Sequence, residues 1–372
     1  MTNSNKREDF EKVNKKEKEL FLELCKFRCP NTEKIESLLK LDAATSEVLG
    51  MLFSNRMAGV AYYVLKNANL LNLVDREFRN SIRNASILNE KINDEFVGCL
   101  KFLTETLEDC NVPYALLKGA YLCNWYPVGC RTSNDIDVLV AAENVGKISA
   151  KLKAVGFEQG HLKNGVFVPA TRQEIIQSKM MRGETVPFII EINAPFMKYL
   201  EVDLNFSLDY KNSDDAVLKE MLSRAQMVSV GDLKVRTLDI SDFILHLCSH
   251  LYKEATTIPW IRMKRDMTFY KFCDIYGLLY DFTEDNFQQL FDRAKITKTE
   301  RELLYCIDGL QELFNSSYGL FLEKELLNKD FDFSEVIAPT EKKLYRYKED
   351  SIKKRFFAKD RMNLLREVTN VW

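Results

Sequence analysis

The sequence predicts an α+β fold in which a mixed β-sheet lies between two helical regions. From about Leu20, and again from Asp239, apolar residues recur every three or four positions, which is the period of a helix. Between these regions, short β-branched runs alternate with amphipathic helical segments. We expect an N-terminal helical domain at 1–110, an α/β core at 111–238 and a C-terminal helical domain at 239–372.

The N-terminal region shows the helical period at Val60, Tyr63 and Val64, and glycine and proline are sparse there. Its last helix is expected from about Asn89 to Asp109. The residues before Leu20 are polar and charged, and we expect a frayed segment or the solvated start of a helix.

The central region changes to strand-forming composition at Tyr114. The C-terminal region returns to a helical pattern, which we expect to continue to Trp372 with one interruption near Pro339. The expected elements of the core are a strand at 114–117, a helix after Gly119, a strand at 136–140, a helix at 144–155, strands at 188–192 and 200–206, and a hairpin at 227–236.

Composition limits the classes of function. The net charge is −2, so the chain as a whole does not attract polyanions. Its nine cysteines include no Cys-x-x-Cys pair, and an odd number argues against a disulfide framework, so we expect a reducing, cytoplasmic location. The polar N-terminus is no signal peptide, and the lack of a long apolar run predicts no membrane span.

An acidic strand is the main candidate for chemistry. Asp135 and Asp137 are two residues apart, so in a strand their side chains share one face, while Ile136 and Val138 face a core. Adjacent carboxylates repel unless a cation lies between them, and Mg²⁺ prefers such oxygen ligands. The alternative is an Asp pair that caps a loop where a strand begins.

The residues before this strand could hold phosphate. Lys118-Gly119 follows a strand, and glycine lets backbone N–H groups approach a phosphate at the start of a helix. Lys118 would neutralise phosphate charge, and the guanidinium of Arg131 could bind phosphate in a bidentate manner. The alternative for Arg131 is a surface loop arginine.

These motifs resemble a known family. The segments Leu117–Leu122, Tyr126-Pro127 and Arg131–Val140 resemble the "KG…YP…R…DIDLLV" pattern of the uncharacterised nucleotidyltransferase family, within the DNA polymerase β-type superfamily. The resemblance implies a polymerase β-like core flanked by helical domains. It also implies Mg²⁺-dependent transfer, with Mn²⁺ as a substitute, of a nucleoside monophosphate from a triphosphate, most commonly ATP.

One departure from the superfamily concerns the phosphate grip. The superfamily signature has a second glycine or a serine directly after the first glycine, and then Asp-x-Asp after a shorter interval than here. In this chain Ala120 follows Gly119, so the serine that normally touches phosphate is missing. Ser133 or Thr132 could take its place, or the phosphate grip differs.

The superfamily places a third carboxylate on a neighbouring strand, where it binds metal and deprotonates the attacking hydroxyl. Asp203 and Glu191 are candidates, each in a strand-like run. We favour Asp203, because Val202–Asn205 resembles the family's "V-[DE]-L-H" strand with asparagine in place of histidine. Glu201, Asp203 and Asn205 share one face. The alternative is a solvent-facing carboxylate on a half-buried strand.

Three polar residues stack on one face of a C-terminal helix, since His246, His250 and Glu254 are four residues apart. They could bind zinc, form a polar stripe at a domain interface, or let His250 contact nucleotide or acceptor. Asp274 resembles a helical aspartate motif of the same family. It either orients an arginine, Arg262 or Arg265, or is a surface carboxylate.

The segment 341–372 is rich in lysine and arginine, with interleaved aromatic residues. Such a segment binds RNA through phosphate contacts and stacking, or forms an amphipathic helix with solvated charges.

The function that we expect is transfer of a nucleotide to an acceptor hydroxyl. Asp135, Asp137 and Asp203 would hold the metal, and Lys118, Gly119, Arg131 and Ser133 would hold the triphosphate. The acceptor stays open between a small molecule, a peptide or protein, and tRNA. The alternative is a non-catalytic protein that keeps the fold to bind a nucleotide or a peptide.

Overall fold

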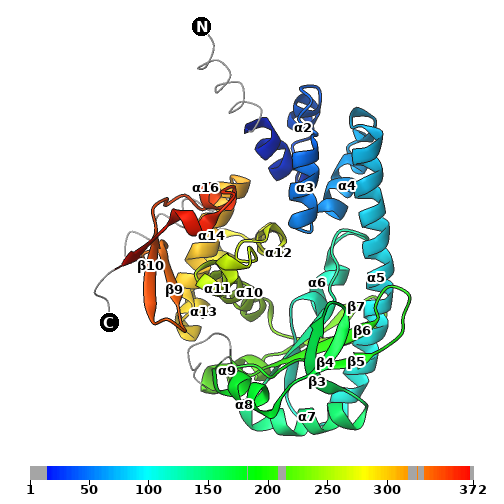
Figure 1. Ribbon diagram of the computed structural model, residues 1–372, viewed down its shortest axis with the longest axis vertical. Helices are drawn as coiled ribbons and strands as arrows, with labels where there is room; N and C mark the ends of the chain where they lie inside the picture. Colours follow the sequence, from blue (N-terminus) through cyan, green and yellow to red (C-terminus); the bar gives the residue numbers. More distant parts are fainter. Residues whose placement is uncertain (1–14, 182, 208–214, 317–324, 326–330, 369–372) are drawn as a thin grey trace. The chain divides into compact units, whose positions relative to one another are not determined.

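The structure, a computed structural model, describes residues 15–181, 183–207, 215–316, 325 and 331–368 (Figure 1). The chain forms two compact units. Unit 1 contains Met1–Ile87 together with Leu247–Trp372, and unit 2 contains Leu88–His246. The division into three domains that the sequence suggested stays a prediction.

Unit 2 is built on an eight-stranded sheet with the order β4-β3-β5-β6-β2-β1-β8-β7. β2 pairs parallel with β6, and β1 with β8, while the remaining pairs are antiparallel. The sheet is therefore mixed, and with the many helices it confirms the α+β class. The strands are β1 (Tyr114–Leu116), β2 (Asp135–Val140), β3 (Glu158–Lys163), β4 (Val166–Pro169), β5 (Phe188–Glu191), β6 (Tyr199–Asn205), β7 (Gln226–Val230) and β8 (Leu233–Thr237).

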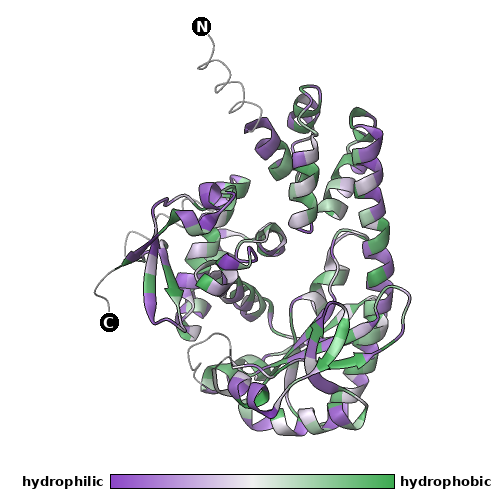
Figure 2. Cartoon of the chain, in the orientation of Figure 1, coloured by the Kyte–Doolittle hydropathy of each residue, from purple (hydrophilic) through white to green (hydrophobic). Residues whose placement is uncertain are grey.

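One hydrophobic core holds this sheet against helices. Figure 2 shows hydrophobic residues along the strands and helices of this part of the chain. Leu100 and Leu103 of α5 belong to the same buried cluster as Val138 of β2 and Val202 of β6. Burial alternates along β6, so its polar side chains project from the face opposite to Val202. The helices of this part of the chain are α5 (Arg76–Glu108), α6 (Gly119–Trp125), α7 (Val145–Ala154), α8 (Arg172–Met181), α9 (Asp215–Ser223) and α10 (Ile240–Ala255).

The predicted elements of the core are present, but four others were missed, namely β3, β4, α8 and α9. The hairpin turns at Gly231, which has a φ of +59°. The helix expected from Asn89 begins at Arg76 instead, where the Asp75 carboxylate accepts the backbone N–H of Phe78 and caps the helix.

Unit 1 combines helices with a small antiparallel sheet. The expectation that residues after Asp239 are helical to Trp372 is wrong, because the sheet β11-β10-β9 lies in this part of the chain. Val336 of β9 and Tyr347 of β10 pack with Ile258 and Ile261 in one buried cluster, which explains why short strands form there. Trp372 lies outside the described residues. The strands are β9 (Glu335–Ala338), β10 (Lys343–Tyr347) and β11 (Leu365–Val368).

The helices of unit 1 begin with one at residues 15–24. No single helix in the described part of the chain is long and apolar enough to cross a membrane; α3 and α4 pass that test only as a pair, bent by 120°. The others are α2 (Thr32–Leu39), α3 (Ser46–Ser54), α4 (Ala58–Asn67), α11 (Ile258–Arg262), α12 (Phe269–Leu279), α13 (Glu284–Thr297), α14 (Glu300–Phe314) and α16 (Ile352–Phe356).

Candidate active site

The acidic strand lies beside a second acidic strand in parallel register. Asp137 of β2 is the partner of Asp203 of β6, and Asp135 is the partner of Glu201. Because both strands are in register, side chains of partner residues share one face of the sheet. Four carboxylates thus gather on the face opposite to the core; we refer to Asp135, Asp137, Glu201 and Asp203 as the carboxylate cluster.

Crowding changes the acidity of this cluster. Burial raises the pKa of Asp203 well above its usual value, and the charges of Asp137, Glu201 and Asp135 raise it further. Burial also raises the pKa of Glu201, followed by the charges of Asp135 and Asp137. The cluster therefore holds more negative charge than its surroundings accommodate without a cation.

Lys118 supplies a positive charge inside the cluster. Its Nζ lies 2.9 Å from Oδ1 of Asp137, and Asn205 Nδ2 donates to the same oxygen at 3.2 Å. Burial alone would lower the pKa of Lys118, but the charges of Asp137 and Asp135 outweigh it and raise the pKa, so the ammonium stays protonated. The sequence predicted a phosphate ligand here, whereas the structure shows an ion pair with Asp137.

Gly119 and Ser133 meet at the same place. A Cβ at Gly119 would lie 2.2 Å from the Oγ of Ser133, so only glycine permits this approach. The Ser133 hydroxyl lies 3.1 Å from Oδ1 of Asp135 and 3.2 Å from its carbonyl oxygen. The loop before β2 is thus packed directly on the turn that follows β1.

Arg131 is held in this loop and is buried, with 7% of its surface exposed. Its guanidinium donates to the carbonyl of Thr132. Two α5 side chains fix the loop, since Asn93 donates to the carbonyl of Arg131 at 2.5 Å and Asn89 to that of Gly129 at 3.0 Å. The alternative of a surface arginine is therefore wrong.

A comparison with known protein families assigns the chain to one of them. The description "Uncharacterised nucleotidyltransferase" matches residues 42–315, which contain the whole cluster and its loops. The chain belongs to this family. A solved structure that it resembles is an antigenic nucleotidyltransferase-like protein from Paracoccidioides brasiliensis, at 13% identity and a TM-score of 0.32, covering 55% of this chain and 89% of that chain. No curated protein matches.

The carboxylate cluster of this family member has the donor set that Mg²⁺ or Mn²⁺ takes, because its side chains offer only carboxylate oxygens. In the described part of the chain, no three His, Cys, Asp or Glu side chains are close enough to hold a metal as they stand. Oδ1 of Asp137 is occupied by Lys118 and Asn205. The residues thus fit a divalent cation in chemistry and charge, and a cation on Oδ1 of Asp137 would take the place of Lys118.

One member of the cluster, Glu201, and one residue near it, Glu184, were missed as candidates. Glu201 shares the face of Asp203, as the alternation of 200–206 already indicated, but its pairing with Asp135 depends on strand register. Glu184 bridges to Asn205 and raises the pKa of Asp203 after burial and the nearer carboxylates do. Nothing in the sequence around Glu184 resembles a metal motif.

The remaining candidates have other surroundings. Glu191 is exposed, pairs in register with Tyr199 at the other end of β6, and lies 3.7 Å from Lys198. His250 and Asp274 belong to unit 1. His250 lies 3.2 Å from Glu254, and Glu254 is also ion-paired with Lys271, which leaves this carboxylate poorly placed to bind zinc.

Asp274 is buried, with 3% of its surface exposed, so the surface alternative is wrong. Arg262 pairs with Glu341 at 3.1 Å.

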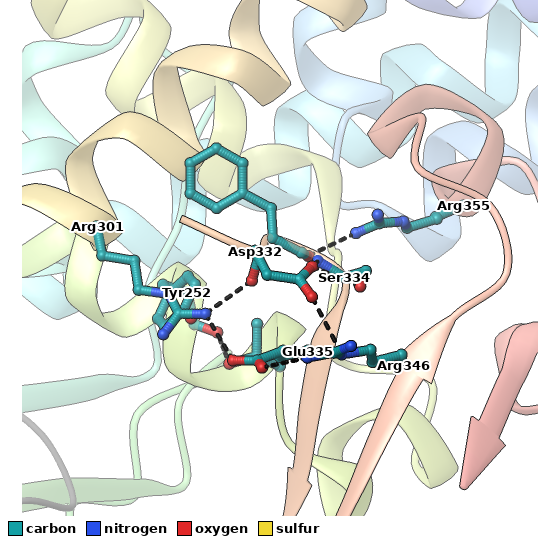
Figure 3. A network of polar contacts seen from close by, with 9 residues as sticks. Tyr252, Arg301, Asp332, Ser334, Glu335, Arg346 and Arg355 are labelled. Carbon is teal, nitrogen blue, oxygen red and sulfur yellow. Dashed lines mark hydrogen bonds and ion pairs between the residues drawn. The ribbon is translucent and has the colours of Figure 1, made fainter. Parts of the chain in front are cut away.

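The basic C-terminal segment is not an amphipathic helix, since it contains β10, α16 and β11. Many of its cations are paired within unit 1 (Figure 3). Arg346 lies 3.1 Å from both Asp332 and Glu335, and Lys343 lies 3.0 Å from Glu367. The RNA interpretation stays a prediction, with fewer unpaired charges to support it.

Proposed function

We propose that this nucleotidyltransferase moves a nucleoside monophosphate, AMP in the first instance, from a triphosphate to an acceptor hydroxyl and releases pyrophosphate. The observation that carries the proposal is the register that pairs Asp137 with Asp203, beside Lys118, in a member of this family. Buried carboxylates side by side are costly, and a metal-dependent reaction gives them a use.

The cluster divides into roles. Asp135 and Asp137 hold Mg²⁺ or Mn²⁺, which when bound neutralises charge on the phosphates and the leaving oxygen. Asp203 completes the ligand set and accepts the proton of the acceptor hydroxyl. Burial and its neighbours raise the pKa of Asp203, and a carboxylate with a raised pKa is a better general base near neutral pH.

The reaction breaks a phosphoanhydride bond of the triphosphate and forms a phosphoester bond to the acceptor. The acceptor oxygen attacks the α-phosphorus, and the bond from that phosphorus to the bridging oxygen breaks. The proton of the hydroxyl passes to Asp203, and the electron pair leaves with pyrophosphate. Lys118, Arg131, Ser133 and the backbone at Gly119 hold the triphosphate in line, so the rate gain comes from positioning and charge neutralisation.

The proposal also covers where the reaction takes place and which acceptor it uses. The cysteines are free thiols, most of them buried, which suits a reducing compartment, so we place the reaction in the cytoplasm. The acceptor is a small molecule, a peptide or protein, or tRNA, and the basic C-terminal segment would serve an RNA acceptor.

The test uses triphosphates labelled at the α-phosphate. Each of ATP, GTP, CTP and UTP is incubated with the protein, Mg²⁺ and one of three pools: total RNA, total protein or a metabolite extract. We expect label to enter one pool from one nucleotide, and transfer to stop with Asp137→Asn and with EDTA. Equal transfer by Asp137→Asn would overturn the proposal, and no transfer into any pool would count against an enzyme.

A second candidate is a non-catalytic nucleotide-binding protein. The Lys118–Asp137 ion pair favours it, because an internal cation already neutralises part of the cluster. Nucleotide binding measured with and without Mg²⁺ separates the two functions. Binding that needs no metal and survives replacement of Asp135 and Asp137 by alanine supports the binding protein.

A further inference from the structure

Lys118, which the sequence predicted as a phosphate ligand, forms an ion pair with Asp137 instead. Its ammonium lies 2.9 Å from Oδ1 of Asp137, with the lysine side chain 22% exposed and the aspartate side chain 8% exposed. We propose that Lys118 is the internal counter-ion of the metal-free cluster and leaves Asp137 when a divalent cation binds. The inference rests on the proposed function and adds a coupling between metal and nucleotide.

The first step concerns the metal-free protein. Asp137 and Asp203 are neighbours on parallel strands, and Asp135 and Glu201 lie two residues before them. Buried carboxylates without a counter-charge destabilise a fold, and an ion pair with a hydrogen bond offsets that cost. Lys118 thus keeps the cluster assembled before any metal arrives.

The second step is mutual exclusion. Mg²⁺ binds carboxylate oxygen at about 2.0–2.1 Å. Lys118 Nζ and Asn205 Nδ2 both donate to Oδ1 of Asp137. A metal on this oxygen would place a double positive charge within a few ångströms of the ammonium, where repulsion is strong. The neutral Asn205 amide adds no such repulsion, so the lysine is the group that moves.

The third step is the path. Lys118 directly precedes α6 and has φ 45° and ψ −113°, outside the regions that a lysine usually adopts. This backbone directs the side chain to Asp137, and such local strain is typical of functional sites. A four-carbon stem lets the ammonium swing from carboxylate to phosphate by side-chain rotation alone. Lys118 would then contact phosphate only after metal has displaced it.

The test compares Lys118→Met with Lys153→Met, a matched loss of one exposed lysine on α7 of the same unit. Mn²⁺ binding is measured directly by electron paramagnetic resonance of the free ion, and melting temperature is recorded in EDTA and in Mn²⁺. We expect Lys118→Met to bind Mn²⁺ about tenfold more tightly, within the usual range of coupling between sites.

The same variant should melt below wild type in EDTA, and the difference should shrink in Mn²⁺, because the metal replaces the missing charge. Its affinity for ATP in the presence of Mn²⁺ should fall. Lys153→Met should match wild type throughout. A second variant that combines Lys118→Met with Asp137→Asn removes both charges and should melt closer to wild type in EDTA than Lys118→Met does.

Several results would overturn the inference. Unchanged or weaker Mn²⁺ binding by Lys118→Met contradicts it, as does a double variant that is as unstable as the single one. If wild type binds Mn²⁺ and transfers nucleotide while Lys118→Met gains nothing, the inference fails and the proposed function stands. If wild type neither binds Mn²⁺ nor transfers nucleotide, the proposed function fails as well.

Discussion

Two regions of this molecule gather charged side chains, and they do so in opposite ways. The carboxylate cluster of unit 2 contains four acids and one lysine, Lys118. The polar network of unit 1, around Asp332, matches each acid with an arginine (Figure 3). There Arg301 lies 2.8 Å from Glu335, and Arg355 donates to backbone carbonyls at Phe333 and Asp350.

The acidity of the two regions differs accordingly. Burial would raise the pKa of Asp332, but hydrogen bonds from Ser334 and the charge of Arg346 outweigh it and lower the pKa. Burial raises the pKa of Asp203, and its neighbours raise it further. A network whose acidic and basic side chains are equal in charge holds strands in place. A cluster with an excess of carboxylates favours the binding of a cation. The network around Asp332 is structural, and the carboxylate cluster is where we expect chemistry.

The largest effect is expected from a substitution in the carboxylate cluster. Asp137→Asn keeps the shape of the side chain but removes a carboxylate that we propose binds metal, so nucleotide transfer should fall by on the order of 10²–10³-fold. Label transfer from α-labelled ATP measures this. Asp332→Asn is the matched control from the balanced network and should retain transfer. Comparable loss in both variants would show that the two regions do not differ in role.

Asp332→Asn should instead reduce stability. It removes the ion pair with Arg346 and weakens the hydrogen bonds from Ser334. Because the carboxylate is 38% exposed, the loss should be about 1–2 kcal/mol in the free energy of unfolding, measured by urea denaturation. Asp281→Asn, which breaks the exposed pair with Arg28, should cost less. The reverse order would contradict a structural role for the network.

A third prediction concerns pH. Burial raises the pKa of Asp308 to about 6. The negative charge of Glu312 adds to this rise, and the positive charge of Arg355 opposes it. The folded chain therefore binds this proton more tightly than the unfolded chain, and stability falls as pH rises from about 4 through this pKa. Asp308→Asn should raise the free energy of unfolding by about 1–2 kcal/mol at pH 7. Melts at several pH values should show no gain at pH 4.

The smallest expected effect tests how much excess negative charge the carboxylate cluster carries. Glu201→Gln removes one crowded charge and should raise the melting temperature in EDTA by on the order of 1–2 °C. It should weaken Mn²⁺ binding severalfold. Glu191→Gln changes an exposed glutamate of β5 and should leave both values unchanged. Destabilisation by Glu201→Gln would mean that the cluster is already neutralised.

Much of the cluster could be predicted from the sequence, because its logic is local. A spacing of two in a strand puts Asp135 and Asp137 on one face, and the same alternation groups Glu201 with Asp203. Local pattern does not say which strand lies beside β2. The family resemblance supplied that neighbour, by placing a third carboxylate on an adjacent strand. The Lys118–Asp137 contact depends on a backbone angle that no pattern of residues indicates for lysine.

The C-terminal region shows where local reasoning fails. The residues after Asp239 were expected to be helical apart from an interruption near Pro339, yet Leu344 and Tyr347 lie in the strand β10. Tertiary packing decides the outcome, since Tyr347 packs on Ile258 and Ile261 of α11 in a cluster formed from distant segments. Four-residue strands carry too little periodicity to outweigh a helical context.

The contact between Gly119 and Ser133 has a consequence for how such proteins are found. A scan for adjacent glycine and serine would pass over this chain, because Ala120 stands in the second position. The hydroxyl of Ser133, from the loop before β2, nevertheless lies beside Gly119, where a side chain at that position would collide with it. Searches for residues that are neighbours in space, and not only in sequence, should therefore recover relatives in which the serine beside this glycine comes from a different loop.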